Sequence, residues 1–220
     1  MKECSYTALE AEPKSTQRKR PEGLERILVA AESLFAKQGY EAVTIKAIAK
    51  NSGQSQANVI YHFKSKKELY INVLRQARER LVSNATPPDI DSKEFSLGEY
   101  ISAFAKDHLD MLTKDEKAVR LLYREILGYG IIEGKELAAK VLGHDLGCFV
   151  QAMEGSRGSM RKGVSPAAAA FLILGINAMF VHAGNVVRHM PGGQFASGHD
   201  KFQKEVINIL LNGMLETIDD

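Results

Sequence analysis

Apolar residues recur at helical spacing along most of this 220-residue chain, and no stretch alternates convincingly as a strand would. The clearest case is Leu24–Phe35, where apolar side chains follow the i, i+3, i+4, i+7 pattern of an amphipathic helix. Short apolar runs such as Phe171–Leu174 lie inside longer helical windows. The pattern predicts an all-α protein of about nine helices.

Capping signals indicate where these helices begin and end. We expect N-caps at Thr44, Ser55 and Ser165, and helix ends at Gly39 and Gly53. Capping boxes are predicted for the pairs Ser65 and Glu68, Ser96 and Glu99, and Thr113 and Glu116. The three longest helices of the second half are expected over residues 131–153, 166–190 and 201–217.

The chain divides at a break centred on Pro87 and Pro88. Residues 1–21 lack apolar periodicity and are expected to form a flexible basic arm. Residues 22–82 are predicted to form a helix-turn-helix domain, and residues 83–220 a second helical domain.

Charge is unevenly distributed between the two ends. Residues 1–86 contain 15 Lys and Arg against 9 Asp and Glu, a net charge of +6. Residues 87–220 contain 14 against 18, a net charge of −4. A basic front and an acidic back indicate that only the front meets a polyanion. Chance asymmetry in a soluble protein is the alternative.

The cysteines and the N-terminal residues bear on location. Cys4 and Cys148 lie far apart without zinc-site spacing, which fits a reduced cytoplasmic protein. The first twenty residues lack an apolar signal core, so export is not expected. Residues 163–187 lack charged side chains and could span a bilayer. Because Asn177 and other polar residues interrupt this segment, a buried helix of a bundle or a dimer interface is the preferred interpretation.

The stretch from Thr44 to Phe63 carries the chemistry. Two short helices joined by a glycine turn can place the second helix in the major groove of DNA, while the N-terminus of the first faces a phosphate. Amide side chains suit adenine edges, so Gln54, Gln56 and Asn58 are candidate base readers. Ala57 leaves room for a thymine methyl group, and Ser55 either caps the helix or binds a phosphate. Phosphate contacts are expected from Thr44, Tyr61, His62, Lys64, Lys66 and Lys67. A short helix with merely solvated polar residues is the alternative.

The segment Ile27–Leu74 resembles the N-terminal domain of TetR-type transcriptional regulators. The shared marks are "AA..LF...GY", "T...IA...G.S" and "YHF.SK..L". The resemblance implies a homodimeric repressor that binds double-stranded operator DNA and is released by a small molecule. It places Thr44, Tyr61, His62 and Lys66 at phosphate contacts, and residues 55–58 at recognition positions. The apolar character of the candidate pocket residues on the middle helices predicts that this effector is largely apolar.

The reading face departs from the family pattern. Such proteins often carry an apolar residue at 54, Lys at 56, Gly at 57, Thr at 58 and an aromatic residue at 60. This chain has Gln54, Gln56, Ala57, Asn58 and Ile60 at those positions. The operator of a relative therefore cannot be transferred to this chain. The basic arm, with Lys14, Arg18, Lys19 and Arg20, either enters a minor groove or is a solubilising tail.

The resemblance also predicts that the last helices pair with their copies in a dimer. Candidate interface residues are Phe171, Gly175, Ala178, Met179, His182, Val206, Leu210 and Met214. An intramolecular core is the alternative for these stripes. Candidate effector-pocket residues on the middle helices are Phe104, His108, Met111, Tyr123, Phe149, Met153, Asn177 and Phe180. Each of these also fits an ordinary core.

Signatures of catalysis are absent from the sequence. None of the six histidines lies in HExxH, and neither GxSxG nor a phosphate-binding glycine loop occurs. We therefore expect no enzyme activity, cofactor or metal, although His182 and His189 could share a helix face. A cytoplasmic helical ligand carrier or enzyme that retains the front domain is the alternative function.

Overall fold

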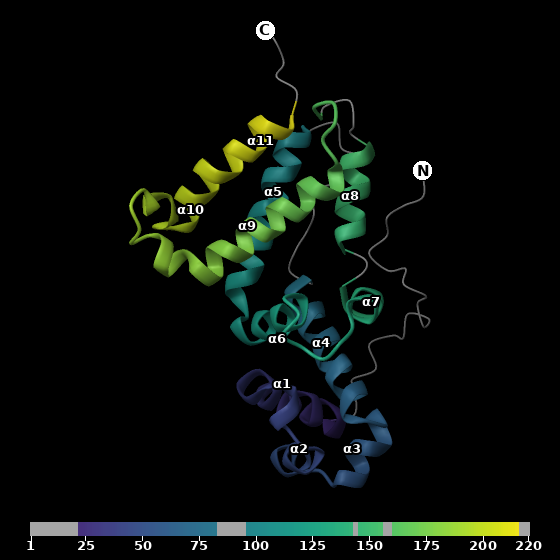
Figure 1. Ribbon diagram of the computed structural model, residues 1–220. Coiled ribbons are helices and arrows are strands. Elements are labelled where there is room, and N and C mark those ends of the chain that lie inside the picture. Colours follow the sequence, from purple (N-terminus) through teal and green to yellow (C-terminus); the bar gives the residue numbers. More distant parts are fainter. Residues whose placement is uncertain (1–21, 83–95, 143–144, 156–159, 216–220) are drawn as a thin grey trace. The chain divides into compact units, whose positions relative to one another are not determined.

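A computed structural model describes residues 22–82, 96–142, 145–155 and 160–215 (Figure 1). All named elements in these ranges are helices, and the prediction of an all-α fold is confirmed. The described residues form two compact units. The first combines residues 22–82 with 115–142, and the second combines 96–114 with the described residues from 145 onward. The domain boundary expected after residue 82 remains a prediction. Residues 115–142, which follow that boundary in the sequence, pack with the N-terminal helices.

The first unit is built around α1 and α4. Its helices are α1 (Glu22–Ala42), α2 (Ile45–Ser52), α3 (Gln56–Phe63), α4 (Lys66–Val82), α6 (Glu116–Ile126), α7 (Gly134–Leu137) and the π-helical turn η1 (Ala138–Leu142). Helix α1 packs on α2, α4 and α6, and α3 packs on α2 and α4. Gly39 lies at φ 81° and interrupts α1 where the sequence predicts its end.

An ionic cluster on Arg80 connects three helices of this unit. Its guanidinium donates to both carboxylate oxygens of Glu32 in α1, at 3.0 and 2.6 Å. It also donates to Oδ2 of Asp115, the N-cap of α6, at 3.0 Å. Burial opposes ionisation of Asp115, but the backbone N–H of Ala118 and the Arg80 guanidinium outweigh it and hold its pKa below the usual value. The cluster therefore stabilises the start of α6 against α1 and α4.

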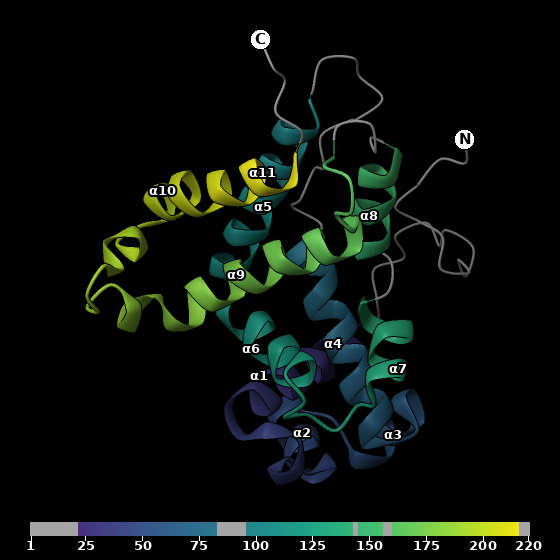
Figure 2. The same cartoon turned by 45° about the horizontal axis from the view of Figure 1, so that its top comes forward.

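The second unit is centred on α9 and α5. Its helices are α5 (Leu97–Lys114), α8 (Asp145–Gly155), α9 (Pro166–Val187), the 3-10 turn η3 (Gly193–Ala196), α10 (His199–Phe202), the π-helical turn η4 (Gln203–Ile207) and α11 (Asn208–Met214). Figures 1 and 2 show α9 crossing α5, and α9 also packs on α8. The core includes Ile101, Ala105, Phe149, Met153 and Ile173.

Most predicted capping residues form the expected bonds. The side chains of Thr44, Ser55 and Ser165 accept from the backbone N–H three residues later. The backbone N–H of Glu68 donates to Ser65, and Ser96 and Glu99 form a reciprocal capping box. These helix starts are specified locally, because each partner lies within one turn.

Three expectations about helix bounds were wrong. The box at Thr113 and Glu116 does not form, because Asp115 caps α6 and the Thr113 hydroxyl donates to the Asp110 carbonyl. The long helix expected over 131–153 is replaced by α7, η1 and α8, with α7 beginning only at Gly134. The last helix is interrupted by the π-helical turn η4 and ends at Met214 rather than at residue 217.

Helix α9 is the one helix in the described part of the chain that is long and apolar enough to cross a membrane. Length and composition alone support that possibility, and about a quarter of its most apolar window is buried within the unit (28%). Its buried residues contact α5 and α8, which fits the bundle helix preferred from the sequence.

Candidate nucleic-acid interface

The turn between α2 and α3 has the geometry of a helix-turn-helix. Gly53 adopts a left-handed conformation at φ 68° and ψ 27°, which a residue with a Cβ reaches only at a cost. The backbone N–H of Gln54 donates to the Ala49 carbonyl at 2.9 Å, which closes the end of α2. Ser55 then caps α3 by accepting from the backbone N–H of Asn58 at 3.1 Å. Residues 53–55 therefore fix how α3 leaves α2.

Helix α3 is anchored by one apolar face and exposes the other. Val59 is fully buried and Phe63 nearly so, and both lie on the side that packs on the rest of the unit. Gln56 and Ala57 are exposed, and Tyr61 retains 80% of its accessible surface. The exposed His62 packs edge-on against the Tyr61 ring at 5.2 Å between centroids. An exposed face of this kind leaves these side chains available to a partner.

Two of the three predicted base readers are bonded to each other. Nδ2 of Asn58 donates to Oε1 of Gln54 at 2.8 Å, and both side chains are half-buried. The Gln54 amide also lies against α1, because a Cβ placed on Gly23 would stand 3.5 Å from its oxygen and its nitrogen. Only Gln56 among the three amides is exposed. The four-residue spacing of Gln54 and Asn58 was the signal from which this pair could have been predicted.

The N-terminus of α2 is arranged as an anion site. Thr44 is extended at φ −111°, and its hydroxyl accepts from the backbone N–H of Ala47 at 3.1 Å. The N–H groups of Ile45 and Lys46 begin the helix and have no intrahelical acceptor. Thr44 and Lys46 are both exposed. This helix end therefore presents backbone donors and a partial positive charge to solvent.

The three predicted lysines differ in their surroundings. Lys64 is exposed at φ 60°, directly after α3. The Lys66 ammonium donates to the carbonyls of Tyr40 and Val43, at 3.0 Å each, and lies 4.1 Å from the centroid of the Tyr40 ring. Lys67 pairs with Glu136 at 2.6 Å, and this hydrogen bond raises the pKa of Lys67. Lys66 and Lys67 thus make internal contacts that sequence reasoning did not anticipate.

The predicted effector residues do not form one group. Phe104 and Phe149 stack in the second unit, with centroids 3.5 Å apart, and Met153 lies in the same core. Phe180 instead packs on Phe202, and Met111 is half-buried on α5. Tyr123 lies on α6 in the first unit, where burial raises its pKa to about 12. The predicted pocket remains a prediction.

A polar pair lies beside the stacked rings. Asn177 is fully buried, and its Nδ2 donates to the Ala105 carbonyl at 2.7 Å and lies 3.2 Å from Nδ1 of His108. Burial lowers the pKa of His108 to about 4, which keeps the imidazole neutral at physiological pH. The Oδ1 atom of Asn177 is buried and meets no donor in the described part of the chain. A buried acceptor without a donor is costly unless a bound molecule supplies one.

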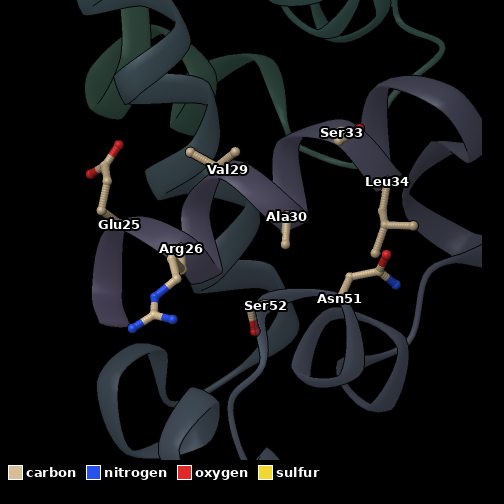
Figure 3. A pocket seen from close by; sticks show the side chains of 8 residues that line it. All are labelled: Glu25, Arg26, Val29, Ala30, Ser33, Leu34, Asn51 and Ser52. Carbon is tan, nitrogen blue, oxygen red and sulfur yellow. The ribbon is translucent and has the colours of Figure 1, made fainter. Parts of the chain in front are cut away.

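A cleft of about 350 Å³ lies elsewhere, between α1 and the C-terminal end of α2 (Figure 3). Six residues of α1 and two of α2 line it: Glu25, Arg26, Val29, Ala30, Ser33, Leu34, Asn51 and Ser52. None of the predicted effector residues is among them. Its surroundings therefore give no support to the predicted pocket.

The predicted dimer stripe is largely solvent-exposed on α9. Phe171 and Met179 are 72% and 65% exposed, Gly175 and His182 are also exposed, and Ala178 is half-buried. On the last helices, Val206 and Leu210 are half-buried. Met214 belongs to the core of its own unit, which fits the intramolecular alternative for that residue. Within the described ranges, no three His, Cys, Asp or Glu residues gather as a metal site.

Comparison with known proteins identifies the N-terminal part. Residues 27–73 match the family described as bacterial regulatory proteins, tetR family, which confirms the resemblance. The HTH-type transcriptional regulator QacR of Staphylococcus aureus is 44% identical over 50 residues, covering 23% of this chain and 27% of QacR. The HTH-type transcriptional activator FasR of Mycolicibacterium smegmatis is 32% identical over 107 residues, or 47% of each chain. The chain thus aligns with less than half the length of these curated relatives.

Most of the chain, beyond the matched N-terminal part, shares its fold with a solved regulator. The structure described as flavonoid-responsive regulator FrrA superposes with a TM-score of 0.64 at 20% identity. The likeness covers 88% of this chain and 97% of FrrA. At this identity the likeness establishes the fold alone.

Proposed function

We propose that this chain, whose residues 27–73 match the family described as bacterial regulatory proteins, tetR family, is a ligand-responsive transcriptional regulator that binds operator DNA. The observation that carries the proposal is the exposed face of α3. Gln56, Ala57 and Tyr61 face solvent there, while Val59 and Phe63 hold the helix on its domain. A helix held rigidly at one face and polar at the other fits the major groove.

In the proposed complex, α3 reads base edges and α2 binds the backbone. The Gln56 amide reaches a base, and Ala57 lies close to a thymine methyl group. Tyr61 and His62 contact phosphates beyond the groove edge, together with Lys64. The backbone N–H groups at the start of α2, next to Thr44, bind a further phosphate. These phosphate contacts determine the register and affinity of binding, and the amide side chains on α3 determine which base sequence is preferred.

The regulator acts as a homodimer in the cytoplasm. Two copies supply two recognition helices, which successive half-sites on one duplex require. The exposed apolar residues of α9, Phe171, Leu172 and Met179, favour this face for the contact between copies. The proposed contact also includes Val206 and Leu210, which are half-buried on the last helices.

The effector is proposed to be a small, largely apolar molecule that binds in the second unit. Phe104 and Phe149 supply aromatic surface, and Oδ1 of Asn177 supplies a buried acceptor. The matching ligand therefore carries an N–H or O–H donor on an apolar frame. Such a ligand releases a repressor when it binds more tightly to a conformer that does not fit the operator.

Selection of bound duplexes from a random library tests DNA reading. The proposal predicts enrichment of an inverted repeat with half-sites one helical turn, or a multiple of it, apart. A library that stays as diverse as its input after several rounds would contradict the proposal. The control is a Gln56→Ala/Tyr61→Ala double variant, which keeps the buried face of α3 and is expected to enrich its site less strongly than the wild type does.

A screen for compounds that release the selected duplex tests the effector site. Asn177→Leu is expected to abolish release without changing operator affinity in the absence of compound. Release of the wild type and of this variant by the same compound concentration would place the effector elsewhere. Because FasR is described as an activator, a promoter-reporter assay decides between repression and activation.

A further inference from the structure

We propose, on the basis of the DNA-binding function above, that Gln54 does not read a base itself but positions Asn58 to read adenine. Sequence alone makes both amides candidate readers. The structure distinguishes them by position, because the Gln54 amide lies against α1 at Gly23, whereas Asn58 is part of α3. A 2.8 Å hydrogen bond from Asn58 Nδ2 to Gln54 Oε1 joins the two amides.

The chemistry of the two amides explains the division. The NH₂ group of Asn58 carries two hydrogens, and its carbonyl has two lone pairs. One hydrogen goes to Gln54, which leaves one N–H and the Oδ1 carbonyl for a base. A single N–H donor beside a single carbonyl acceptor is the set that pairs with N7 and the N6 amino group of adenine. Asn58 therefore retains the full adenine-reading set after bonding to Gln54.

Gln54 is held in place on its other side. Its backbone N–H is bonded to the Ala49 carbonyl, directly after the left-handed Gly53. Its amide lies against α1 at Gly23, where a Cβ would stand at ordinary contact distance. Ser55 fixes the backbone of Asn58 by accepting from its N–H at 3.1 Å. The Gln54 side chain therefore lies between α1 and Asn58, and its Oε1 orients the Asn58 amide.

The pair favours one orientation of the Asn58 amide. Rotating this amide by half a turn, with Gln54 unchanged, would bring the carbonyl oxygens of both residues together and lose the hydrogen bond. With Gln54 in place, donor and acceptor of Asn58 have a set order along the groove. Without it, the amide can rotate, and the order that matches adenine is populated only part of the time. The predicted consequence is reduced discrimination at one base pair.

The experiment measures dissociation constants for the duplex selected by the wild type and for every single base-pair substitution of it. Four proteins are compared: wild type, Asn58→Ala, Gln54→Met and Gln54→Glu. In the wild type, replacing one A·T pair is expected to weaken binding about 5- to 150-fold, and Asn58→Ala is expected to remove that preference. Gln54→Met should reduce discrimination at the same pair by about 2- to 12-fold, the effect of one hydrogen bond.

Gln54→Glu is the matched variant, because its carboxylate still accepts from Nδ2 of Asn58. Discrimination at that base pair should return to the wild-type ratio, while all duplexes bind more weakly because the added charge repels phosphate. A merely structural role for Gln54 would weaken all sequences alike in Gln54→Met. Thermal unfolding of each variant verifies that the domain is folded.

Three outcomes would overturn the inference while leaving DNA binding intact. In the first, Gln54→Met changes preference at a different base pair from Asn58→Ala, so that Gln54 reads a base directly. In the second, Gln54→Met leaves every preference unchanged. In the third, Gln54→Glu behaves as Gln54→Met does. If the wild type selects no sequence, the proposed function fails first, and the inference fails with it.

Discussion

The hydroxyl of Tyr70 donates a 2.7 Å hydrogen bond to the carboxylate of Glu125, and both side chains are buried. These residues join α4 to α6, although 55 positions separate them in the sequence. The second carboxylate oxygen accepts from the backbone N–H of Ile132 at 2.9 Å. Burial, followed by the bond to Glu125, raises the pKa of Tyr70 far above its ordinary value, so the hydroxyl remains a donor at any physiological pH.

Tyr70→Phe is expected to lower the free energy of unfolding by about 1–3 kcal/mol, because a buried carboxylate oxygen loses its donor. Gly130→Ala is expected to have a similar effect for a steric reason. A Cβ on Gly130 would stand 1.9–2.1 Å from the Glu125 carboxyl group, so the carboxylate must leave Tyr70 and Ile132. Urea unfolding of both single variants and the double variant tests the link. If the two effects add fully in the double variant, the residues do not act through one carboxylate.

Lys66 and Lys64 are expected to respond differently to substitution. Lys66→Met removes the donor to the carbonyls of Tyr40 and Val43 and should lower the free energy of unfolding by about 1–2 kcal/mol. Lys64→Met should leave stability nearly unchanged, because that side chain is exposed. The salt dependence of DNA binding separates their roles further. Losing one phosphate contact reduces the slope of log affinity against log salt by about 1.

We expect that reduction for Lys64→Met and not for Lys66→Met. A reduction of the salt slope by about 1 for Lys66→Met would support the phosphate contact of Lys66 that the sequence predicts. Unchanged stability of Lys66→Met would show that its carbonyl contacts contribute little.

Capping and turn residues in the sequence predicted those parts of the site whose hydrogen-bond partners lie nearby in the chain. Thr44, Gly53 and Ser55 act through partners within one helical turn, and their roles could be inferred from spacing. The partners of Lys66 precede it by 23 to 26 residues and become neighbours only when α1 packs on α4. No periodicity in the sequence reports such a contact.

Helix interruptions in the second half escaped prediction for a related reason. The apolar pattern over residues 131–153 continues through the π-helical turn of η1, which shifts the face of the helix without a proline. At α6, Thr113 and Asp115 both precede acidic residues suitable for a first turn, but Arg80 pairs with Asp115. This tertiary ion pair favours Asp115 over Thr113 as the N-cap of α6, a preference that the local sequence does not show.

His108 should make stability depend on pH. Its pKa is about 4 in the folded protein, against an ordinary value of 6.5, because burial disfavours the imidazolium. Between these values the unfolded chain binds more protons, so stability falls as pH falls through this window. The expected loss between pH 7 and pH 5 is about 2 kcal/mol.

His108→Phe keeps a ring beside Phe104 and cannot take up a proton. The variant should therefore lose about 2 kcal/mol less than the wild type over the same interval. Urea midpoints at the two pH values measure the difference. Equal losses in both proteins would refute a buried neutral His108.

Phe171→Asp and Met179→Asp test the dimer face of α9. A charge placed at the centre of an apolar contact should weaken self-association at least 100-fold, by roughly 3 kcal/mol or more. Val29→Asp is the control, because Val29 is a 57% exposed apolar residue on α1. Sedimentation equilibrium at micromolar protein gives the masses. A wild type that sediments as a monomer, or α9 variants that sediment as dimers, would exclude this face.

A ratio of two dissociation constants tests most directly whether α3 reads DNA sequence. Fluorescence anisotropy at one fixed salt concentration would compare the selected duplex with a shuffled duplex of the same length and composition. If α3 reads base edges, the selected duplex binds at least about 1,000-fold more tightly than the shuffled one. Equal affinity for both duplexes would contradict sequence reading by α3, because it would leave only the sequence-independent attraction between a basic domain and phosphates.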